Sequence, residues 1–425
     1  MDLTALATRR RETAAHCPDG GGDGITRRAL LKALGVGAAI TATETLTTRV
    51  AFAEPGYTGD VLVVLSLRGG FDGLSAVVPT SDPHYLQLRP HVGVPQSVLL
   101  PLGNGFGLHP AMKPLLPLWK AGTLAAVHGV GQQNPTRSHF AAMEEMERAA
   151  PGSSLRTGWL DRTLGTRSAS TFTAVAIGDS TPQSLAGPHP ELSMKDLSGF
   201  TLQGASSEQQ RGTWLKALGE LHRSGQSVSA STGRLALAAA SSIQHLPADR
   251  TTARYPGSEL GTGLSDLARL IKSNVGVQVA AIDCGDWDMH TNMGGHDSGW
   301  MRDKLADLAA GLAAFAADLG PRMSSTTVLT LSEFGRRAEE NGSGGLDHGH
   351  GNLVLLMGGG VIGSKVHGRW PGLSDSALDD GAVAGVTDYR DVVGEVLQKR
   401  CGAGSLSSIF PGFKSQGALG LVRRR

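Results

Sequence analysis

Six short apolar runs, each followed at once by a glycine-rich or polar loop, restrict the fold of this chain more than any other feature. Runs of this kind, rich in Val, Ile and Leu, suit strands that are buried on both faces of a parallel sheet. Glycines just after a run let the chain turn sharply out of a strand. We therefore expect strands at residues 61–67, 124–128, 174–177, 277–282, 327–331 and 353–357.

Helical patterns lie between several of these runs. Apolar residues recur at spacings of three and four, and so form one stripe, at Leu305, Leu308, Leu312, Phe315 and Leu319. A similar stripe at residues 264–271 precedes the run at 277–282. Alternating strands and helices predict an α/β fold, with a mostly parallel, doubly wound sheet between helices.

The first 53 residues read as an export signal and not as part of the fold. Residues 26–32 are close to the twin-arginine pattern, with Leu30 where Phe is commoner. A short apolar run at 33–42 and a small-x-small cleavage site at 51–53 follow in the expected order. The run is too short to span a bilayer. We expect the twin-arginine translocase to export the protein to the periplasm or beyond.

Residues 54–425 are expected to form a single α/β domain, in which the polar segment 186–260 is an insertion or a cap. No other stretch is apolar enough to be a transmembrane segment.

The 39 basic and 38 acidic residues nearly cancel, so no broad basic field exists to attract nucleic acid. Cys284 and Cys401 could pair outside the cytoplasm, and two free thiols are an equal alternative.

Acidic residues and histidines follow the expected strands directly. Ligands of open α/β sheets bind beyond the carboxyl ends of the strands, so these side chains should converge at one edge. Carboxylates and imidazoles from separate loops typically bind a divalent metal, here zinc or manganese in preference to calcium. Taken singly, each could be a solvated loop residue or an N-cap. The predicted ligands are Asp72, Asp286, Asp288, His290, Glu333, His348 and His350.

Ser138 and Arg137 precede a helical pattern that starts near Phe140. Ser138 is therefore predicted as a helix N-cap. A hydroxyl at a helix N-terminus also suits an oxyanion or a phosphate group, which Arg137 could clamp. Both residues are catalytic candidates for that reason. The sequence has no Gly-x-Ser-x-Gly elbow and no His-Glu-x-x-His motif.

The chain resembles the bacterial family called domain of unknown function 1501, whose members are usually exported by the twin-arginine route. The resemblance covers nearly all of residues 54–425 and rests on VVLSLRGGFDGL, LHPAMKPLLPLWKAGTLAAVHGVG, PTRSHFAAMEEME, TGWLDR, GDWDMHTN, LSEFGRRAEENGSGGLDHGHGN and GVTDYRDVVGEVL. The family looks like a branch of the alkaline phosphatase and sulfatase superfamily. That likeness implies an alkaline-phosphatase-like sandwich with a metal-dependent site at the strand ends.

The resemblance also implies roles for residues in the first, third and fifth of these stretches. Asp72 stands where the superfamily places its first metal-binding Asp, after the first strand. Asp286 and His290 match its Asp-x-x-x-His pair, although Asp288 is an alternative partner for His290. Ser138 lies near the nucleophile loop.

The stretch LSEFGRRAEENGSGGLDHGHGN departs from the superfamily pattern. Glu333 stands where the superfamily has the Asp of an Asp-His pair, but Phe334 replaces the His, which removes a ligand from one metal position. His348 or His350 matches the late histidine. Gln133 stands where sulfatases carry a modified Cys or Ser. A single-metal site or an inactive descendant therefore fits better than a two-zinc site.

Two functions follow from these patterns. The first is an exported metal-dependent hydrolase or transferase that acts on a phosphate or sulfate ester of a small molecule or a glycan. The second is a non-catalytic exported protein that retains the fold for binding or assembly, on a glycan or a partner protein. The second function is motivated by the substitution at Phe334 and by the lack of an unambiguous nucleophile, and it stays open as the alternative because a fold alone does not dictate an activity.

Overall fold

A computed structural model describes residues 60–165, 173–178, 181–189, 191–200, 207–223, 228–247 and 250–425. The predicted export signal at residues 1–53 lies outside these ranges. The chain divides into two compact units, and the larger one comprises Thr45–Thr201 and Leu218–Arg425. Of the smaller unit, the structure describes residues 207–217, which form most of helix α7 (Glu208–His222).

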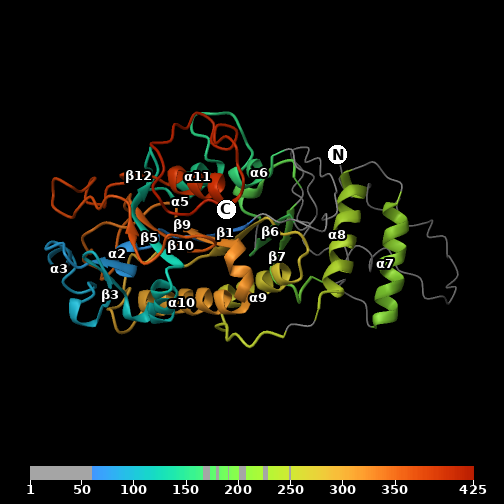
Figure 1. Ribbon diagram of the computed structural model, residues 1–425, viewed down its shortest axis with the longest axis horizontal. Coiled ribbons are helices and arrows are strands. Elements are labelled where there is room, and N and C mark those ends of the chain that lie inside the picture. The colour runs from blue at the N-terminus through green and yellow to red at the C-terminus, as the bar shows by residue number, and fades with distance from the viewer. Residues whose placement is uncertain are drawn as a thin grey trace, which may run out of the picture. The chain divides into compact units, whose positions relative to one another are not determined.

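A mixed sheet forms the centre of the larger unit (Figure 1). Its order is β11-β5-β10-β9-β1-β8-β6-β7, and β12 also pairs with β5. The strands are β1 (Val61–Leu67), β5 (Leu124–Gly131), β6 (Ala174–Ile177), β7 (Glu191–Met194), β8 (Val279–Cys284), β9 (Thr326–Leu331), β10 (Asn352–Gly358), β11 (Val366–His367) and β12 (Thr387–Asp388). Neighbours from β9 to β7 are parallel, whereas β10 is antiparallel to both β5 and β9.

All six predicted strands are present, and the prediction of a mostly parallel sheet is confirmed, with one exception in direction. Strand β10 is as buried as predicted but runs against its neighbours. Residues 332–351, which the structure describes throughout, contain no helix between β9 and β10. Without such a crossover the chain cannot return to the far edge and start a parallel strand. Both ends of this connection therefore stay at the carboxyl edge of β9.

Helices cover both faces of the sheet (Figure 1). Alternate residues of β1 point to opposite faces: Val63 and Leu65 pack with α9 (Glu259–Lys272) and α10 (Trp300–Leu319), and Leu62 and Val64 face the other core. The helices that contribute to that second core are α5 (His139–Arg148), α6 (Trp159–Leu164) and α11 (Tyr389–Arg400). These faces make the predicted α/β sandwich.

Shorter elements fill the connections. A three-stranded antiparallel sheet has the order β2-β4-β3, formed by Val77–Pro79, Phe106–Leu108 and Leu100–Gly103. The remaining helices are α2 (Gly73–Ala76), α3 (Tyr85–Leu88), α4 (Leu116–Lys120) and α8 (Val228–Gln244), with 3-10 turns at Gln96–Val98, Pro110–Leu115, Gln183–Leu185 and Gly320–Ser325. The segment 186–260 supplies the sheet strand β7 as well as α7 and α8.

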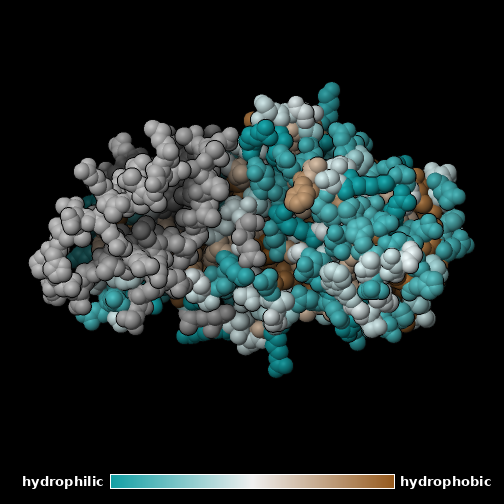
Figure 2. Space-filling view, turned by 180° about the vertical axis from the view of Figure 1, so that it is seen from behind, coloured by the Kyte–Doolittle hydropathy of each residue, from teal (hydrophilic) through white to brown (hydrophobic). Residues whose placement is uncertain are grey.

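The surface formed by the described residues is mainly hydrophilic on the face shown in Figure 2. Large apolar side chains that are exposed occur singly, as is normal for a globular surface, at Leu86, Phe140, Leu155, Leu221 and Trp300. Within the described ranges, no helix has both the length and the apolar character that a membrane span needs.

Candidate metal centre

Four connections meet at the carboxyl edge of the central sheet. Residues 68–72 follow β1, residues 285–290 follow β8, and residues 332–351 link β9 to β10. Residues 132–138 lead from β5, which runs parallel to β9, into helix α5. Because β10 is antiparallel, the long 332–351 connection lies at this edge from start to end. The fold therefore brings together residues that are distant in the sequence.

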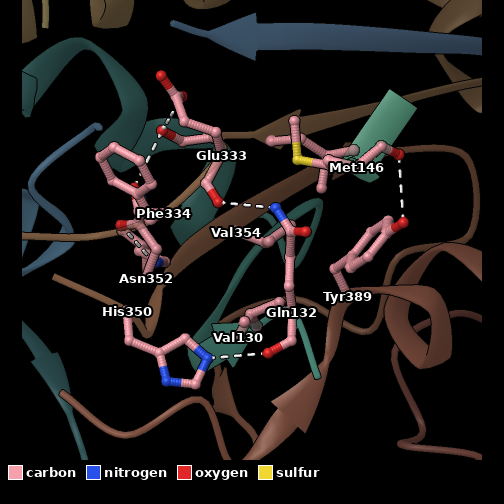
Figure 3. A pocket seen from close by; sticks show the side chains of 13 residues that line it. Val130, Gln132, Met146, Glu333, Phe334, His350, Asn352, Val354 and Tyr389 are labelled. Atoms are coloured by element: carbon pink, nitrogen blue, oxygen red, sulfur yellow. Dashed lines mark hydrogen bonds between the residues drawn. The ribbon is translucent and has the colours of Figure 1, made fainter. Parts of the chain in front are cut away.

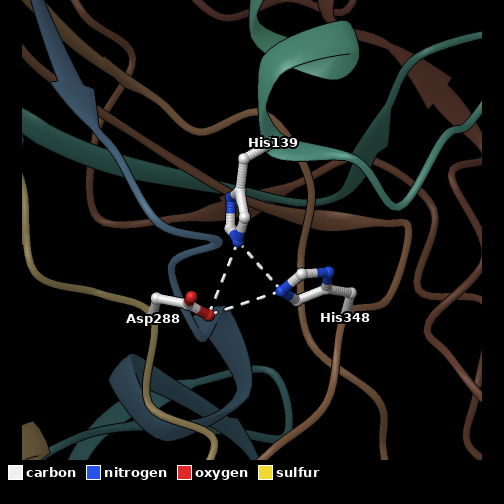
Figure 4. A group of neighbouring side chains, drawn as sticks. All are labelled: His139, Asp288 and His348. Atoms are coloured by element: carbon white, nitrogen blue, oxygen red, sulfur yellow. Dashed lines mark hydrogen bonds and ion pairs between the residues drawn. The ribbon is translucent and has the colours of Figure 1, made fainter.

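Three side chains from these connections face one another (Figure 4). One possible ligand atom from each of His139, Asp288 and His348 lies within 4.8 Å of the other two. The two imidazole Nε2 atoms are 2.9 Å apart, and Asp288 Oδ1 is 3.5 Å from His139 and 3.3 Å from His348. His290 lies beside them, with its Nε2 2.9 Å from His348 Nε2 and 3.0 Å from Asp288 Oδ1. We call these four residues the His–Asp cluster.

The other nitrogen of each ring, Nδ1, faces an oxygen that accepts hydrogen bonds. These contacts join His139 to Glu333 Oε1 at 2.7 Å, His290 to Asp347 Oδ1 at 2.8 Å, and His348 to the Arg137 carbonyl at 2.7 Å. An ionised carboxylate or a carbonyl can only accept, so each Nδ1 is the donor. A neutral imidazole then carries its lone pair on Nε2.

The consequence is that three Nε2 lone pairs and one carboxylate oxygen are gathered in one small region. Without a proton or a cation between them, such groups repel one another. Burial lowers the pKa of His348, although its bond to the Arg137 carbonyl opposes this, so the neutral ring is favoured. Burial disfavours the charged form of Asp288, but the hydrogen bond and charge of Arg336, helped by His290 and His139, lower its pKa to about 2. The arrangement is suited to a cation.

The donor set fits zinc or manganese. Imidazole nitrogen and carboxylate oxygen are ordinary ligands of both ions, whereas calcium prefers oxygen alone. Tetrahedral zinc with bonds of about 2.0–2.1 Å places its ligand atoms about 3.3 Å apart. The separations of 2.9 to 3.5 Å between His139, Asp288 and His348 lie around that value. Carboxylates and carbonyls behind the Nδ1 atoms are the usual partners of metal-bound histidines.

Glu333 is one of the acceptors that lie behind the Nδ1 atoms of the cluster. It is buried, and its Oε1 accepts hydrogen bonds from the Gly69 backbone at 2.8 Å and from His139 Nδ1. The adjacent Phe334 is also buried, and its ring lies 4.8 Å from that of His139 and 4.7 Å from that of His348. Phe334 therefore packs against two rings of the His–Asp cluster.

A small pocket is lined by residues that include Gln132, Glu333 and Phe334 (Figure 3). Within it, the Gln132 side chain donates to the carbonyls of Ala142 at 2.8 Å and Glu333 at 2.9 Å. These two bonds connect helix α5, which carries His139, to the connection that carries His348. Gln132 thereby fixes the relative position of two members of the cluster.

Asp72 does not join the His–Asp cluster. Both of its oxygens are bound by Arg89, at 2.6 and 2.9 Å, and one also caps α2 through the Ser75 backbone at 3.0 Å. Burial opposes the ionisation of Asp72, but the charge and hydrogen bonds of Arg89 outweigh it and lower the pKa of the carboxyl group. The carboxylate is already neutralised, so the structure gives it a structural role.

Two further predicted ligands also lie apart from the cluster. Asp286 is exposed and has a left-handed backbone with φ of 65°, so it turns the chain after β8. His350 uses both ring nitrogens elsewhere, with Nδ1 2.6 Å from Asp379 and Nε2 2.9 Å from the Gln132 carbonyl. Of the seven predicted ligands, the structure brings together Asp288, His290 and His348, with Glu333 directly behind them.

The two predicted catalytic residues lie at the start of α5. Ser138 is its N-cap, as predicted, but its side chain makes no capping bond and is exposed. Arg137 forms an ion pair with Asp380 at 2.6 Å, and its carbonyl orients His348. The arginine side chain is therefore engaged, whereas the serine hydroxyl has no hydrogen-bond partner among the described residues.

His139 is a member of the His–Asp cluster that the sequence alone does not single out. It is the first residue of α5, immediately after Ser138, and a helix start draws attention to capping and not to metal binding. A usable signal was present, because His139 also follows a strand, β5, through one short loop. Arg336 and Asp347 were missed as well, since only the folded chain shows which ring or carboxylate they contact.

Residues 60–398 match the family described as "Protein of unknown function (DUF1501)". No curated relative matches the sequence. Similar solved structures include the zinc complex of the C-terminal periplasmic domain of EcEptC from Escherichia coli. The two share 10% identity and a TM-score of 0.32, over 74% of this chain and 77% of that chain.

Two further structures show the same degree of similarity. The PsFucS1 sulfatase from Pseudoalteromonas sp. has 13% identity and a TM-score of 0.35, over 86% of this chain and 74% of that chain. A protein in the alkaline phosphatase superfamily from Vibrio parahaemolyticus has 11% identity and a TM-score of 0.32, over 81% and 71%. The sheet order and strand directions of the chain itself confirm the expected α/β fold class.

The position of Asp72 generates a testable prediction. Asp72→Asn leaves the Arg89 charge buried without its partner, so we expect a loss of about 3–5 kcal/mol in the free energy of unfolding, with divalent-metal uptake unchanged. The pKa of Asp72 lies below its ordinary value of 3.8, so the pair stabilises the fold above that pH. The difference from wild type should shrink as the pH falls below it.

Denaturant titration across pH, together with elemental analysis, measures both effects. Asp286→Asn is the matched control, because Asp286 is exposed, and it should change neither stability nor metal content. If Asp72→Asn abolishes metal binding while unfolding at the wild-type denaturant concentration, Asp72 is a ligand and the structural role is wrong.

Proposed function

We propose that this chain, which belongs to the DUF1501 family, is an exported metal-dependent enzyme that hydrolyses or transfers a phosphate or sulfate ester. The observation that carries the proposal is the His–Asp cluster, in which three oriented imidazoles present their Nε2 lone pairs beside an ionised carboxylate. His139, Asp288 and His348 would hold a divalent ion, zinc or manganese, and His290 lies next to that position. Such an ion would polarise an oxygen of the ester.

The surrounding residues support an anionic substrate. Helix α5 begins at the site and has ten residues, so the positive end of its dipole faces the cluster. Ser138, at that end, offers an exposed hydroxyl without a capping bond, which makes it the proposed nucleophile. Glu333 and Asp347 hold the rings of His139 and His290 in place. The choice of a phosphate or sulfate ester rests on the motif resemblance together with this local geometry.

A non-catalytic binding function is the alternative, and one observation favours it. Among the described residues, no side chain within hydrogen-bond distance could take the proton of the Ser138 hydroxyl. A nucleophilic serine is normally activated by an adjacent base. A chain with a metal site but no activated nucleophile could bind the anionic group of a glycan or a partner protein without reaction.

The metal proposal predicts that His139→Ala reduces zinc affinity by at least about tenfold, because it removes one of the three closest ligands. Isothermal titration of the protein with zinc measures this. His350→Gln is the matched control, since His350 lies outside the cluster and should leave the affinity unchanged. The proposal fails if His139→Ala and wild type bind zinc equally well.

The catalytic proposal predicts turnover of aryl phosphate or aryl sulfate esters by metal-loaded protein, and a loss of about 100-fold or more in kcat for Ser138→Ala. Thr136→Ala, in the same loop, is the control. Turnover that survives in Ser138→Ala would exclude this serine as the nucleophile. No turnover of either ester by wild type, with zinc and manganese both tested, would favour the binding function.

Export by the twin-arginine translocase is part of the proposal, and it concerns residues outside the described ranges. Substituting the pair Arg27→Lys and Arg28→Lys should leave the protein in the cytoplasmic fraction, because that pathway reads the arginine pair. Arg9→Lys and Arg10→Lys provide the matched control. Unchanged export of the Arg27 and Arg28 variant would show that another route is used.

A further inference from the structure

Two buried arginines face carboxylates at the carboxyl edge of the sheet. The Arg336 side chain is 1% exposed, and its Nη2 lies 2.7 Å from Asp288 Oδ1. The Arg89 side chain is fully buried and binds both oxygens of Asp72. Two of the carboxylates that the sequence offers as metal ligands therefore already have a permanent positive charge beside them.

Arg336 sits in a cage of backbone carbonyls. Its guanidinium donates to Gly70 at 2.6 Å, to Leu346 at 2.9 Å and to Trp287 at 3.0 Å, and also to Gly69. These oxygens come from three of the four connections that build the site. A cage of oxygens is what a hard metal cation prefers, but here a guanidinium fills it.

The guanidinium also shares the groups that a second metal ion would need. Asp288 Oδ1 faces Arg336 on one side and the imidazole nitrogens on the other. Arg336 Nη1 is 3.4 Å from His290 Nε2. A first ion beside Asp288 meets only the charge of Arg336, whereas a second divalent ion at Asp288 or His290 would lie within a few ångströms of both Arg336 and the first ion. Like charges at that distance repel strongly.

An arginine also limits the ability of Asp72 to bind a metal ion. Arg89 also donates to the carbonyls of Ala338 at 2.8 Å and Arg337 at 3.0 Å. Both acceptors belong to the 332–351 connection, so Arg89 ties the loop after β1 to the loop that carries His348. The guanidinium binds both carboxylate oxygens and neutralises their charge, which makes Asp72 a poor ligand for an ion.

We propose that the site takes a single divalent ion, and that Arg336 is a fixed second cation that prevents a second ion from binding beside it. The inference rests on the proposed function, because it concerns the same His–Asp cluster. Arg336 then supplies the positive charge that a second metal ion would otherwise provide. Since all of its donors are used within the protein, Arg336 acts on an anionic substrate through its electric field and not through direct contact.

The first test is the stoichiometry of the full chain without its signal. Elemental analysis after loading with zinc should give one equivalent, and electron paramagnetic resonance after loading with manganese should show isolated ions. Two equivalents, or a spin-coupled manganese pair, would overturn this inference and leave the proposed function standing. No metal uptake would overturn both. One equivalent without ester turnover would count against the proposed function alone.

The second test assigns the effect to Arg336. Arg336→Met removes the charge and should admit a second equivalent, whereas Arg336→Lys retains a charge and should stay at one. Arg337→Met is the matched control, because Arg337 lies next in the chain and pairs with the exposed Asp380. Circular dichroism verifies folding. If Arg336→Met folds and still binds one equivalent, the proposed role of Arg336 is wrong. If Arg336→Met does not fold, a second equivalent bound by Arg336→Lys would contradict that role.

Discussion

The Nε2 lone pairs of three histidines converge beside the Asp288 carboxylate, and much of the surrounding structure serves to hold them there. Each ring is oriented from behind by an oxygen acceptor: Glu333, Asp347 and the Arg137 carbonyl. Phe334 packs against two of the rings, and Gln132 ties their supporting segments together. These contacts fix which nitrogen carries the proton, so the convergence of lone pairs is a property of the fold and not of one rotamer.

The convergence depends in turn on the direction of strand β10. A parallel β10 would have needed a crossover, and the chain would have left the carboxyl edge between Glu333 and His348. Because β10 is antiparallel, the whole connection stays at that edge, and an isolated antiparallel bridge between Arg336 and His348 folds it back on itself. One short segment thus supplies Glu333, which accepts from His139, Arg336, which pairs with Asp288, and the ring of His348.

Sequence reasoning was sufficient for the sheet and for part of the site. Apolar runs such as 61–67 and 174–177 predict their strands to the residue, because a strand buried on both faces is almost entirely apolar. The rule that ligands gather at strand ends finds Asp288, His290 and His348. It cannot separate them from Asp72, since the pairing with Arg89 joins residues whose proximity exists only in the folded chain. Nor does it find His139, whose helix-start position suggests a cap.

The central claim is that the His–Asp cluster binds a divalent metal ion. Anomalous diffraction from crystals of the protein, measured on both sides of the zinc and manganese absorption edges, tests it most directly. We expect one anomalous peak bonded to His139 Nε2, Asp288 and His348 Nε2. Crystals grown with excess metal that show no peak there, or a peak bound instead by Asp72 or His350, would contradict it.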